Sequence, residues 1–280
     1  MTVMRPETHS AALDRKVEYM DLLPRTIRNF RMQYRLGLET LVPWLRRLNV
    51  FHTGANVCEI GCAEGGVLTA FLEQGASFGL GTDIASALLD QISIPLAEKL
   101  GVDVTYAHHD VIGDEIPDVW KERFDVVILR DVIEHLDDPA VAIENISRIM
   151  KPGGVLLITF PPYHSAFGGH QQLLGNKVSG LPWVHLLPKG LFMNVIKSGD
   201  PQNQEEVRRL HRIRCTPQKI TRAFSNAGLT IEDERYFGLR PVFKWKYQMS
   251  IPELELTAVK WFPLVKNLAM EAAFVARKPE

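Results

Sequence analysis

One short stretch of the chain combines an acidic residue with closely spaced small residues. Glu59 closes an apolar run, and the turn after it holds Gly61, Cys62, Ala63 and Gly65. Small residues let a backbone approach a ligand closely, and open α/β sheets bind nucleotides at the turns that follow their strands. We therefore predict a nucleotide-binding turn over these residues.

Two kinds of nucleotide are compatible with this turn. Gly61, Ala63 and Gly66 approach the G-x-G-x-x-G/A fingerprint of dinucleotide sites, which would make the chain a nicotinamide-dependent oxidoreductase. Glu59 favours a different ligand, because a pyrophosphate gains nothing from a carboxylate at this place. A ligand with an ammonium and a sulfonium group does gain from it. An ordinary strand–turn–helix junction without a ligand is the third interpretation.

Further acidic residues follow the next three predicted strands. Asp83 ends the second strand, Asp110 follows the third and Asp131 follows the fourth. The carboxyl ends of parallel strands meet at one edge of a sheet, and an acid at the end of the second strand can accept hydrogen bonds from both ribose hydroxyls. A helix-capping role for Asp83 stays open, and Asp103 and Asp114 compete with Asp110.

Residues 56–162 resemble the class I S-adenosylmethionine-dependent methyltransferases, in their small-molecule branch. Glu59 and the glycines after it match the first motif of that family, with Ala63 in place of the middle glycine. Glu134-His135 and Lys151-Pro152-Gly153-Gly154 match two later signatures. The resemblance implies S-adenosyl-L-methionine as cofactor. The first fifty residues and the segment 163–215 show no match.

The resemblance also implies which residues meet the cofactor. Glu59 would meet its amino-acid portion, Asp83 its ribose and Asp110 the adenine amino group, with Val111 packing against the ring. The complete set of implied contacts adds Gly61, Cys62, Ala63, Gly65, Ile84, Arg130, Asp131 and Val132.

Methyl transfer to a hydroxyl group needs a base, and histidine is the natural one near neutral pH. His170 follows Gly168-Gly169, a pair that would let it approach a ligand, and we hypothesise that His170 is the general base. His135 is a second catalytic candidate, and a structural bond to a backbone carbonyl stays equally open for it. His164 is a third histidine of this region, for which a surface or packing role stays open. Oxygen is the expected nucleophile, and nitrogen and carbon stay open.

Apolar runs that alternate with helical segments must position these residues. Strands are predicted at 56–60, 77–82, 102–107, 124–129 and 155–160, with helices near 65–74, 85–100 and 139–150. Such alternation is typical of a doubly wound, mostly parallel α/β sheet. A helix from Thr216-Pro217 to Gly228 precedes two further strands, 229–237 and 269–277, which we expect to pair antiparallel at the sheet edge. The prediction is a seven-stranded, Rossmann-like methyltransferase fold.

The chain then divides into four segments. Residues 1–54 form a helical N-terminal cap, 55–162 the cofactor-binding core, 163–215 an inserted lid that binds the acceptor, and 216–280 the C-terminal part of the core with the antiparallel edge strands.

Two of these segments carry more detailed predictions. In the cap, apolar residues such as Val17, Met20 and Ile27 recur at helical spacing, and Pro24 and Pro43 should divide the region into separate helices. The insert holds large apolar residues, among them Trp183, Leu187, Leu191 and Phe192. They favour a lid over a partly hydrophobic acceptor, and contact with a membrane surface or a second copy is the alternative.

Composition limits the partners. The 32 basic and 33 acidic residues give a net charge of −1, so we expect no nucleic acid. Three cysteines without a C-x-x-C pair predict neither disulfides nor a metal site and suit the cytoplasm. We find no secretory signal and no apolar run long enough to span a membrane.

An arginine-rich stretch remains open to two interpretations. Arg208, Arg209, Arg212 and Arg214 lie beside His211. They predict either a solvated helix face paired with Glu205 and Glu206, or recognition of an anionic acceptor group such as phosphate or carboxylate.

The functional prediction is methyl transfer from S-adenosyl-L-methionine to a small-molecule acceptor that is partly hydrophobic or anionic. The alternatives are a nicotinamide-dependent oxidoreductase and an S-adenosylmethionine-binding protein without catalytic activity.

Overall fold

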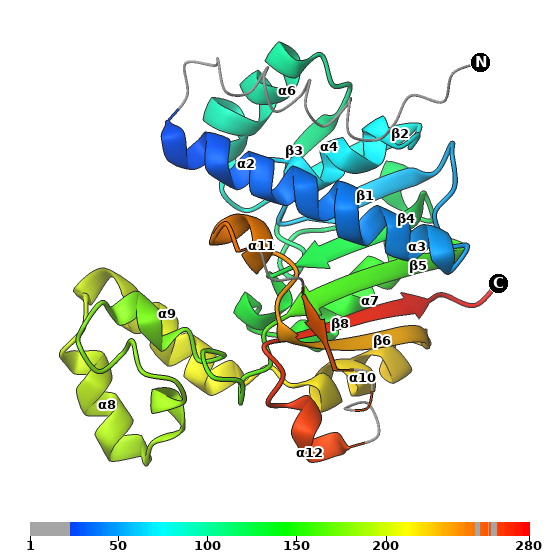
Figure 1. Ribbon diagram of the computed structural model, residues 1–280. Coiled ribbons are helices and arrows are strands. Elements are labelled where there is room, and N and C mark those ends of the chain that lie inside the picture. The colour runs from blue at the N-terminus through cyan, green and yellow to red at the C-terminus, as the bar shows by residue number, and fades with distance from the viewer. Residues whose placement is uncertain (1–22, 250–252, 257, 259–261) are drawn as a thin grey trace.

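The computed structural model describes residues 23–249, 253–256, 258 and 262–280, and Val17 and Met20 lie outside them. One sheet of eight strands runs through this part of the chain (Figure 1). The strands are β1 Asn56–Ile60, β2 Phe78–Asp83, β3 Thr105–His108, β4 Phe124–Arg130, β5 Met150–Phe160, β6 Thr230–Leu239, β7 Leu254–Glu255 and β8 Glu271–Arg277.

The sheet has the order β3-β2-β1-β4-β5-β8-β6-β7. The first five strands are parallel, and β8 pairs antiparallel with both β5 and β6. This confirms the doubly wound fold and the antiparallel C-terminal pair. The seven predicted strands are present. The two-residue strand β7 extends the edge beyond them, and two residues are too short to produce a sequence pattern.

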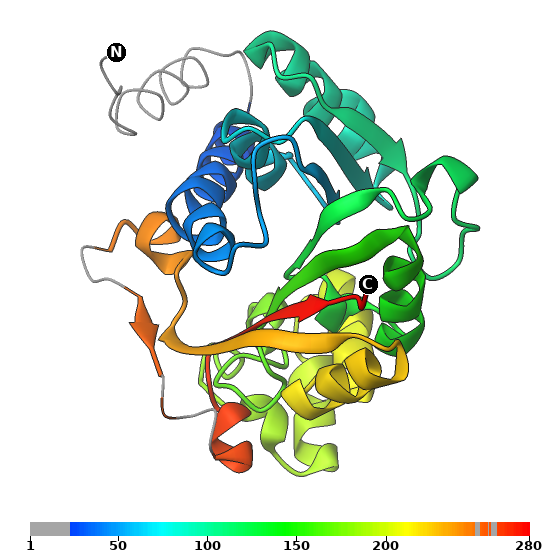
Figure 2. The ribbon, with the colours of Figure 1, turned by 90° about the vertical axis from the view of Figure 1, so that its right-hand side faces the viewer.

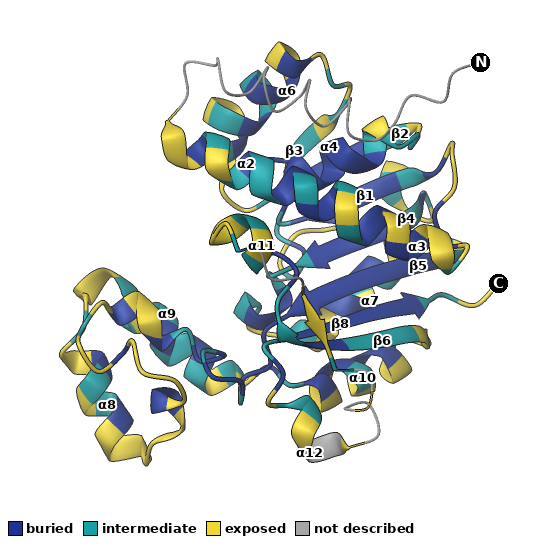
Figure 3. Cartoon of the chain, in the orientation of Figure 1, coloured by how far each residue is buried: buried dark blue, intermediate teal, exposed yellow. Residues whose placement is uncertain are grey.

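Helices cover both faces of the sheet (Figure 2). α7 (Pro139–Ile149) and α10 (Pro217–Asn226) pack on the face that receives Val127 and Leu129. The opposite face receives Val126 and Ile128 and is covered by helices from the first third of the chain. Those helices are α2 Pro24–Leu36, α3 Val42–Arg47 and α4 Gly66–Glu73. The central strands are therefore buried on both sides, as Figure 3 shows.

The division at Pro43 was predicted wrongly. Pro24 begins α2, but the chain stays helical from Pro24 to Arg47, because a π-helical turn over Gly37–Leu41 joins α2 to α3. A proline ring clashes with the carbonyl four residues earlier in a regular α-helix, and a wider turn relieves that clash. A second π-helical turn precedes Pro95 in the same way, between α5 (Ser86–Leu88) and α6 (Ile94–Leu100).

The insert forms a lobe beyond the carboxyl ends of the parallel strands (Figure 1). Its helices are α8 (Lys189–Lys197) and α9 (Pro201–Ile213). The lobe has a small core of its own, which consists of Leu174, Val184, Phe192, Ile196 and Val207. Phe192 is therefore buried, whereas Trp183 and Leu191 are exposed.

The remaining helices are short. α11 (Phe243–Lys246) follows β6 and α12 (Pro263–Lys266) precedes β8. Among the residues described, no helix combines the length and the apolar character that crossing a bilayer requires.

Candidate active site

A cavity of about 290 Å³ lies at the carboxyl ends of the parallel strands. Strand order reverses between β1 and β4, and open α/β sheets bind ligands at such a switch point. Seven of the predicted cofactor residues line this cavity, namely Gly61, Asp83, Ile84, Asp110, Val111, Asp131 and Val132. His135 lines it as well. Glu59, Cys62, Ala63, Gly65 and Arg130 do not belong to its wall.

The glycine turn is shaped by its own protein neighbours. Gly61 and Gly65 have φ angles of +68° and +79°, which L-residues rarely adopt. A Cβ on Gly61 would overlap the Val132 side chain, and one on Gly65 would overlap the Tyr106 hydroxyl. Ala63 takes the left-handed conformation without being glycine, at φ +47°. The prediction did not include Tyr106, which supports the turn from β3.

Glu59 lies behind the turn and not on the cavity wall. Its side chain is only 2% exposed, and its Oε2 accepts the Leu68 N–H at 3.1 Å. Leu68 belongs to the first turn of α4, where free amides and the helix dipole favour an acceptor. Burial raises the pKa of Glu59 to about 8, although Arg130 and the Leu68 amide oppose the shift. In this structure the carboxyl is turned toward α4, and its contact with the cofactor's amino-acid portion stays a prediction.

Replacing Glu59 with Gln should change how stability depends on pH. The folded-state pKa of about 8 exceeds the ordinary value of a glutamate, so the stability that the neutral carboxyl supports is lost progressively as pH rises to about 8. Between pH 6 and pH 9 the wild type should lose about 2–3 kcal/mol more unfolding free energy than E59Q. Urea denaturation of both proteins at the two pH values measures this. Parallel losses would show that Glu59 does not titrate in this range.

Asp83 is fixed at the cavity by two backbone amides. Its Oδ2 accepts the Ala63 N–H at 3.1 Å and its Oδ1 accepts the Ala85 N–H at 2.9 Å. A carboxylate oxygen can accept more than one hydrogen bond. Asp83 therefore holds the turn in place and keeps acceptor capacity for a diol at the cavity.

Of the three acidic residues considered for the adenine position, only Asp110 lines the cavity. Asp110 and Val111 line the cavity, whereas Asp114 and Asp103 do not. Asp114 instead accepts the Asp110 N–H at 2.8 Å, and Asp110 Oδ1 accepts the Ile112 N–H at 2.9 Å. Asp114 thus supports the loop that presents Asp110.

Asp131 is held by two arginines. Arg130 donates to its Oδ2 at 2.7 Å and Arg240, just after β6, donates to its Oδ1. Arg240 also donates to Glu271 of β8 at 2.7 Å. Burial alone would raise the pKa of Asp131, but Arg240 and Arg130 bring it below its usual value. No local sequence pattern connects Arg240 with Asp131, because the two lie 109 residues apart.

The two catalytic candidates lie side by side. The ring centroids of His135 and His170 are 4.9 Å apart. His135 Nδ1 lies 2.7 Å from an oxygen of Glu206 on α9. Burial, with His135 next in effect, lowers the pKa of His170 to about 4, so this ring is neutral at physiological pH. His164 lies apart from this pair, on the wall of a separate cavity.

The glycines before His170 serve packing. A Cβ on Gly168 would overlap the Pro162 carbonyl oxygen, and one on Gly169 would lie 2.5 Å from His185 Cβ. Neither glycine has a positive φ, whereas His170 itself does, at +50°. The two glycines let the chain pack closely against Pro162 and His185, and this packing holds His170 in place.

Glu134 completes a set of possible metal ligands. Its side chain is buried, and neither carboxylate oxygen has a hydrogen-bond partner among the described residues. One ligand atom each from Glu134, His135 and His170 lie within 4.8 Å of one another. A carboxylate with two imidazoles suits a divalent transition-metal ion. The sequence had predicted no metal constellation, because His170 is distant along the chain.

His170 also lines a second cavity, of about 330 Å³. Apolar and aromatic side chains make up much of its wall, including Phe167, Phe243, Tyr247 and Met270. Arg240 and Lys246 add positive charge. The histidine pair therefore lies between the two cavities, with one ring on the wall of each.

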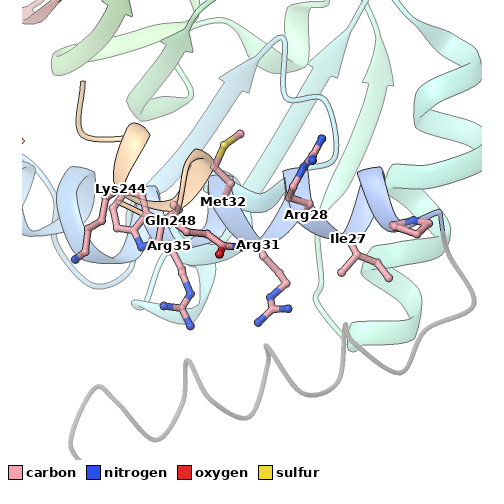
Figure 4. A pocket seen from close by; sticks show the side chains of 9 residues that line it. Ile27, Arg28, Arg31, Met32, Arg35, Lys244 and Gln248 are labelled. Carbon is pink, nitrogen blue, oxygen red and sulfur yellow. The ribbon is translucent and has the colours of Figure 1, made fainter. Parts of the chain in front are cut away.

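A third, larger hollow lies away from these residues, between α2 and the α11 region (Figure 4). Its volume is about 550 Å³, and Arg28, Arg31, Arg35 and Lys244 stand along it. None of the residues predicted to bind cofactor or to catalyse lines it.

α2 is seated directly on the glycine turn. Gln33 accepts the Gly66 N–H at 3.2 Å, and Gln33 and Asn29 both donate to the Glu64 carboxylate at 2.9 Å. A Cβ on Gly66 would lie 2.5 Å from the carbonyl oxygen of Phe30. The backbone of α2 therefore leaves no room for a side chain there.

Gly66→Ala should consequently push α2 off the turn. We expect a loss of about 1–3 kcal/mol of unfolding free energy, typical of an overpacked core. Gly190→Ala on α8 is the matched control, because a Cβ there meets nothing within 4 Å. Urea denaturation should show G190A unchanged or slightly more stable, as expected for alanine in a helix. Equal stability of G66A and the wild type would contradict this contact.

Comparison with known proteins agrees with this geometry. A family model described as a methyltransferase domain matches residues 30–234. The ubiquinone biosynthesis O-methyltransferase of Coxiella burnetii (strain Dugway 5J108-111) is 29% identical over 138 residues, which are 49% of this chain and 54% of that protein. The protein of the same name from Pseudomonas fluorescens (strain SBW25) is 32% identical over 114 residues, 40% of this chain and 47% of that one. The chain thus spans about half the length of these relatives.

Solved structures share the fold. An S-adenosylmethionine dependent methyltransferase from Mesorhizobium loti superposes with a TM-score of 0.52 at 18% identity, over 84% of this chain and 96% of that one. Magnesium protoporphyrin IX methyltransferase from Synechocystis, with bound SAH, gives 0.52 at 14% identity over 97% and 95%. At such identities the similarity establishes the Rossmann-like methyltransferase fold.

Proposed function

This chain belongs to the methyltransferase domain family and uses S-adenosyl-L-methionine as methyl donor, and we propose that it methylates a hydroxyl oxygen of a small molecule. The observation that carries the proposal is the histidine pair between the two cavities, with His135 bonded to Glu206. Methylation of a hydroxyl needs a proton acceptor, whereas a neutral amine can attack with its own lone pair.

The first cavity suits the donor. Asp83 offers carboxylate oxygens to the ribose hydroxyls, and Asp110 and Val111 stand where an adenine would lie. S-adenosylmethionine supplies a methyl group on a positively charged sulfur. Asp131 faces the same cavity and keeps a negative charge there, because two arginines hold it ionised.

His135 is the base in this scheme. Glu206 accepts its Nδ1–H, which leaves the Nε2 lone pair to take the proton of the acceptor hydroxyl. His170, neutral at physiological pH, lies against His135 and faces the second cavity. This assignment moves the base from His170, the first choice on sequence, to its neighbour, because among the described residues a carboxylate bonds the ring of His135 and none bonds that of His170.

The second cavity suits the acceptor. Phe167, Phe243 and Met270 favour an apolar or aromatic body, and Lys246 favours a polar or anionic edge. The name of the ubiquinone biosynthesis relatives supports oxygen as the accepting atom. We assign residues 163–215 the role of a lid over this cavity, 55–162 and 216–280 that of the core, and 1–54 that of the N-terminal cap.

A mass-shift screen with deuteromethyl-labelled donor tests the proposal. Phenols and alcohols should gain one labelled methyl group, and their O-acetylated derivatives should gain none. Label found in amines or thiols alone would refute oxygen transfer.

A parallel assay with a chelator tests the role of the histidines. Activity that survives chelation supports a general base. Activity that is lost on chelation and restored by a divalent metal would assign Glu134, His135 and His170 to a metal ion.

A further inference from the structure

A separate cavity of about 120 Å³ lies at the base of the lid. It forms where the chain after β5, the start of α8 and the end of α9 meet. Its lining residues are Tyr163, His164, His185, Leu186, Leu187, Lys189, His211 and Arg214. The lining contains no acidic residue and has no residue in common with the donor or acceptor cavity.

The arginine-rich stretch divides at this cavity. Arg208 and Arg212 pair with Glu205 on α9 at 3.7 and 3.2 Å, and Arg209 pairs with Glu206 at 2.9 Å. Arg214 has no carboxylate partner within the part of the chain that the structure describes, and it lines the cavity. Three of the arginines thus form ion pairs along the face of α9, as the first interpretation predicted, whereas Arg214 does not.

Arg214 instead donates toward a neutral imidazole. Its NH2 lies 3.3 Å from His211 Nε2, and His211 Nδ1 lies 2.6 Å from the Tyr163 hydroxyl. Because Nε2 accepts from the guanidinium, Nδ1 carries the proton and donates to Tyr163, whose hydroxyl then donates to the His185 carbonyl at 3.3 Å. A guanidinium normally pairs with an anion. Arg214, where this chain of hydrogen bonds begins, is therefore still available to an anionic ligand.

His185 is buried in the same wall and is incompletely bonded. The side chain is 1% exposed, and Nε2 donates to the Tyr163 carbonyl at 2.6 Å. Its Nδ1 is buried without a hydrogen-bond partner among the described residues. A buried ring nitrogen in a polar cavity is expected to have a partner, so a bound group that carries a hydroxyl would satisfy it.

The start of α8 adds further donors. Lys189 is the first residue of this nine-residue helix, and no side chain caps its N-terminus. Uncapped first-turn amides and the positive end of the helix dipole favour an anion. Burial lowers the pKa of His211, with Arg214 and Lys189 next in effect, so the histidine is neutral and the two cations supply the charge.

We propose that this cavity binds a phosphate group. Inorganic phosphate, or a phosphate monoester in its monoanionic form, matches the two cations, Arg214 and Lys189, and keeps a protonated oxygen that can donate to His185 Nδ1, which a carboxylate cannot do. The site is independent of methyl transfer and belongs to the lid.

Calorimetric titration of the full chain with inorganic phosphate tests the site, with chloride holding ionic strength constant. Phosphate should bind at least ten times more weakly to R214Q and to K189Q than to the wild type. R212Q is the matched control, because Arg212 is exposed, pairs with Glu205 and does not line the cavity, and its affinity should stay within twofold. Unchanged affinity in both R214Q and K189Q would overturn the site. Acetate binding as tightly as phosphate would overturn the assignment to phosphate.

Vesicles distinguish a soluble phosphate from a lipid headgroup. Binding of inorganic phosphate that R214Q weakens supports a soluble phosphate compound. Binding only to phosphatidic acid vesicles, absent with phosphatidylcholine and weakened in R214Q, supports a headgroup. Absence of both overturns the proposal, and methyl transfer by R214Q shows separately whether the active site is intact.

Discussion

His135→Gln is expected to lower kcat for methyl transfer about 10²–10⁴-fold, the usual contribution of a general base. Glutamine keeps a polar side chain of similar reach but cannot take up a proton. Glu206→Gln should cost less, about 10–100-fold, because the amide oxygen can still accept the Nδ1–H but no longer supplies the negative charge that stabilises the protonated ring. Steady-state kinetics with the acceptor found in the screen measures both values.

A surface histidine provides the control for this experiment. His52 is exposed, and among the described residues its ring bonds only the Thr53 carbonyl, so His52→Gln should retain full activity. His170→Gln separates the two histidines, because a ring held neutral beside the base should matter less than the base itself. If H170Q lost more activity than H135Q, the roles of the two residues would have to be exchanged.

Asp83→Ala is expected to weaken S-adenosylhomocysteine binding about 100-fold. Two hydrogen bonds from ribose hydroxyls to a carboxylate are together worth about 3 kcal/mol, which corresponds to that factor. Asp83 also accepts the Ala63 and Ala85 amides, so the substitution should loosen the turn as well. Calorimetric titration gives the dissociation constants.

Two further variants make the Asp83 result interpretable. Asp118→Ala removes an exposed carboxylate that pairs with Lys121 on the surface, and its affinity should equal that of the wild type. Asp83→Asn preserves the shape of the side chain but replaces one acceptor oxygen by a donor, so an intermediate loss is expected. Wild-type affinity in D83A would show that the ribose does not bind at the end of β2.

The sheet could be predicted because its signal is local. Each buried parallel strand is a short apolar run, and the acid or small residue after it marks the carboxyl edge. Asp83, Asp110 and Asp131 could therefore be assigned to one cavity without coordinates, and the structure brings all three together.

The rest of the site depends on contacts that no local pattern carries. Glu206 lies 71 residues from His135, in a lobe whose sequence resembles nothing in the core. Arg240 reaches Asp131 only because β6 and β8 pair beside β5. Tyr106 meets the turn only because β3 lies beside β2. Each of these residues is placed by topology and not by spacing.

Glu59 has a structural role that its motif does not reveal. An acid before the glycines predicts attraction to a cationic ligand. In the structure the carboxyl is buried and holds the start of α4, and burial raises its pKa to about 8. The acid therefore supports the turn from behind the cavity, whereas Asp131 lies on the cavity wall between two arginines that lower its pKa.

A crystal structure with S-adenosylhomocysteine would test most directly whether donor and acceptor meet at the histidine pair. The ribose hydroxyls should donate to Asp83, and the sulfur should lie within about 7 Å of His135 Nε2, since an attack distance of about 3 Å and one hydrogen bond separate them. A ligand seated in the hollow between α2 and α11, or one whose sulfur points away from both histidines, would contradict this account.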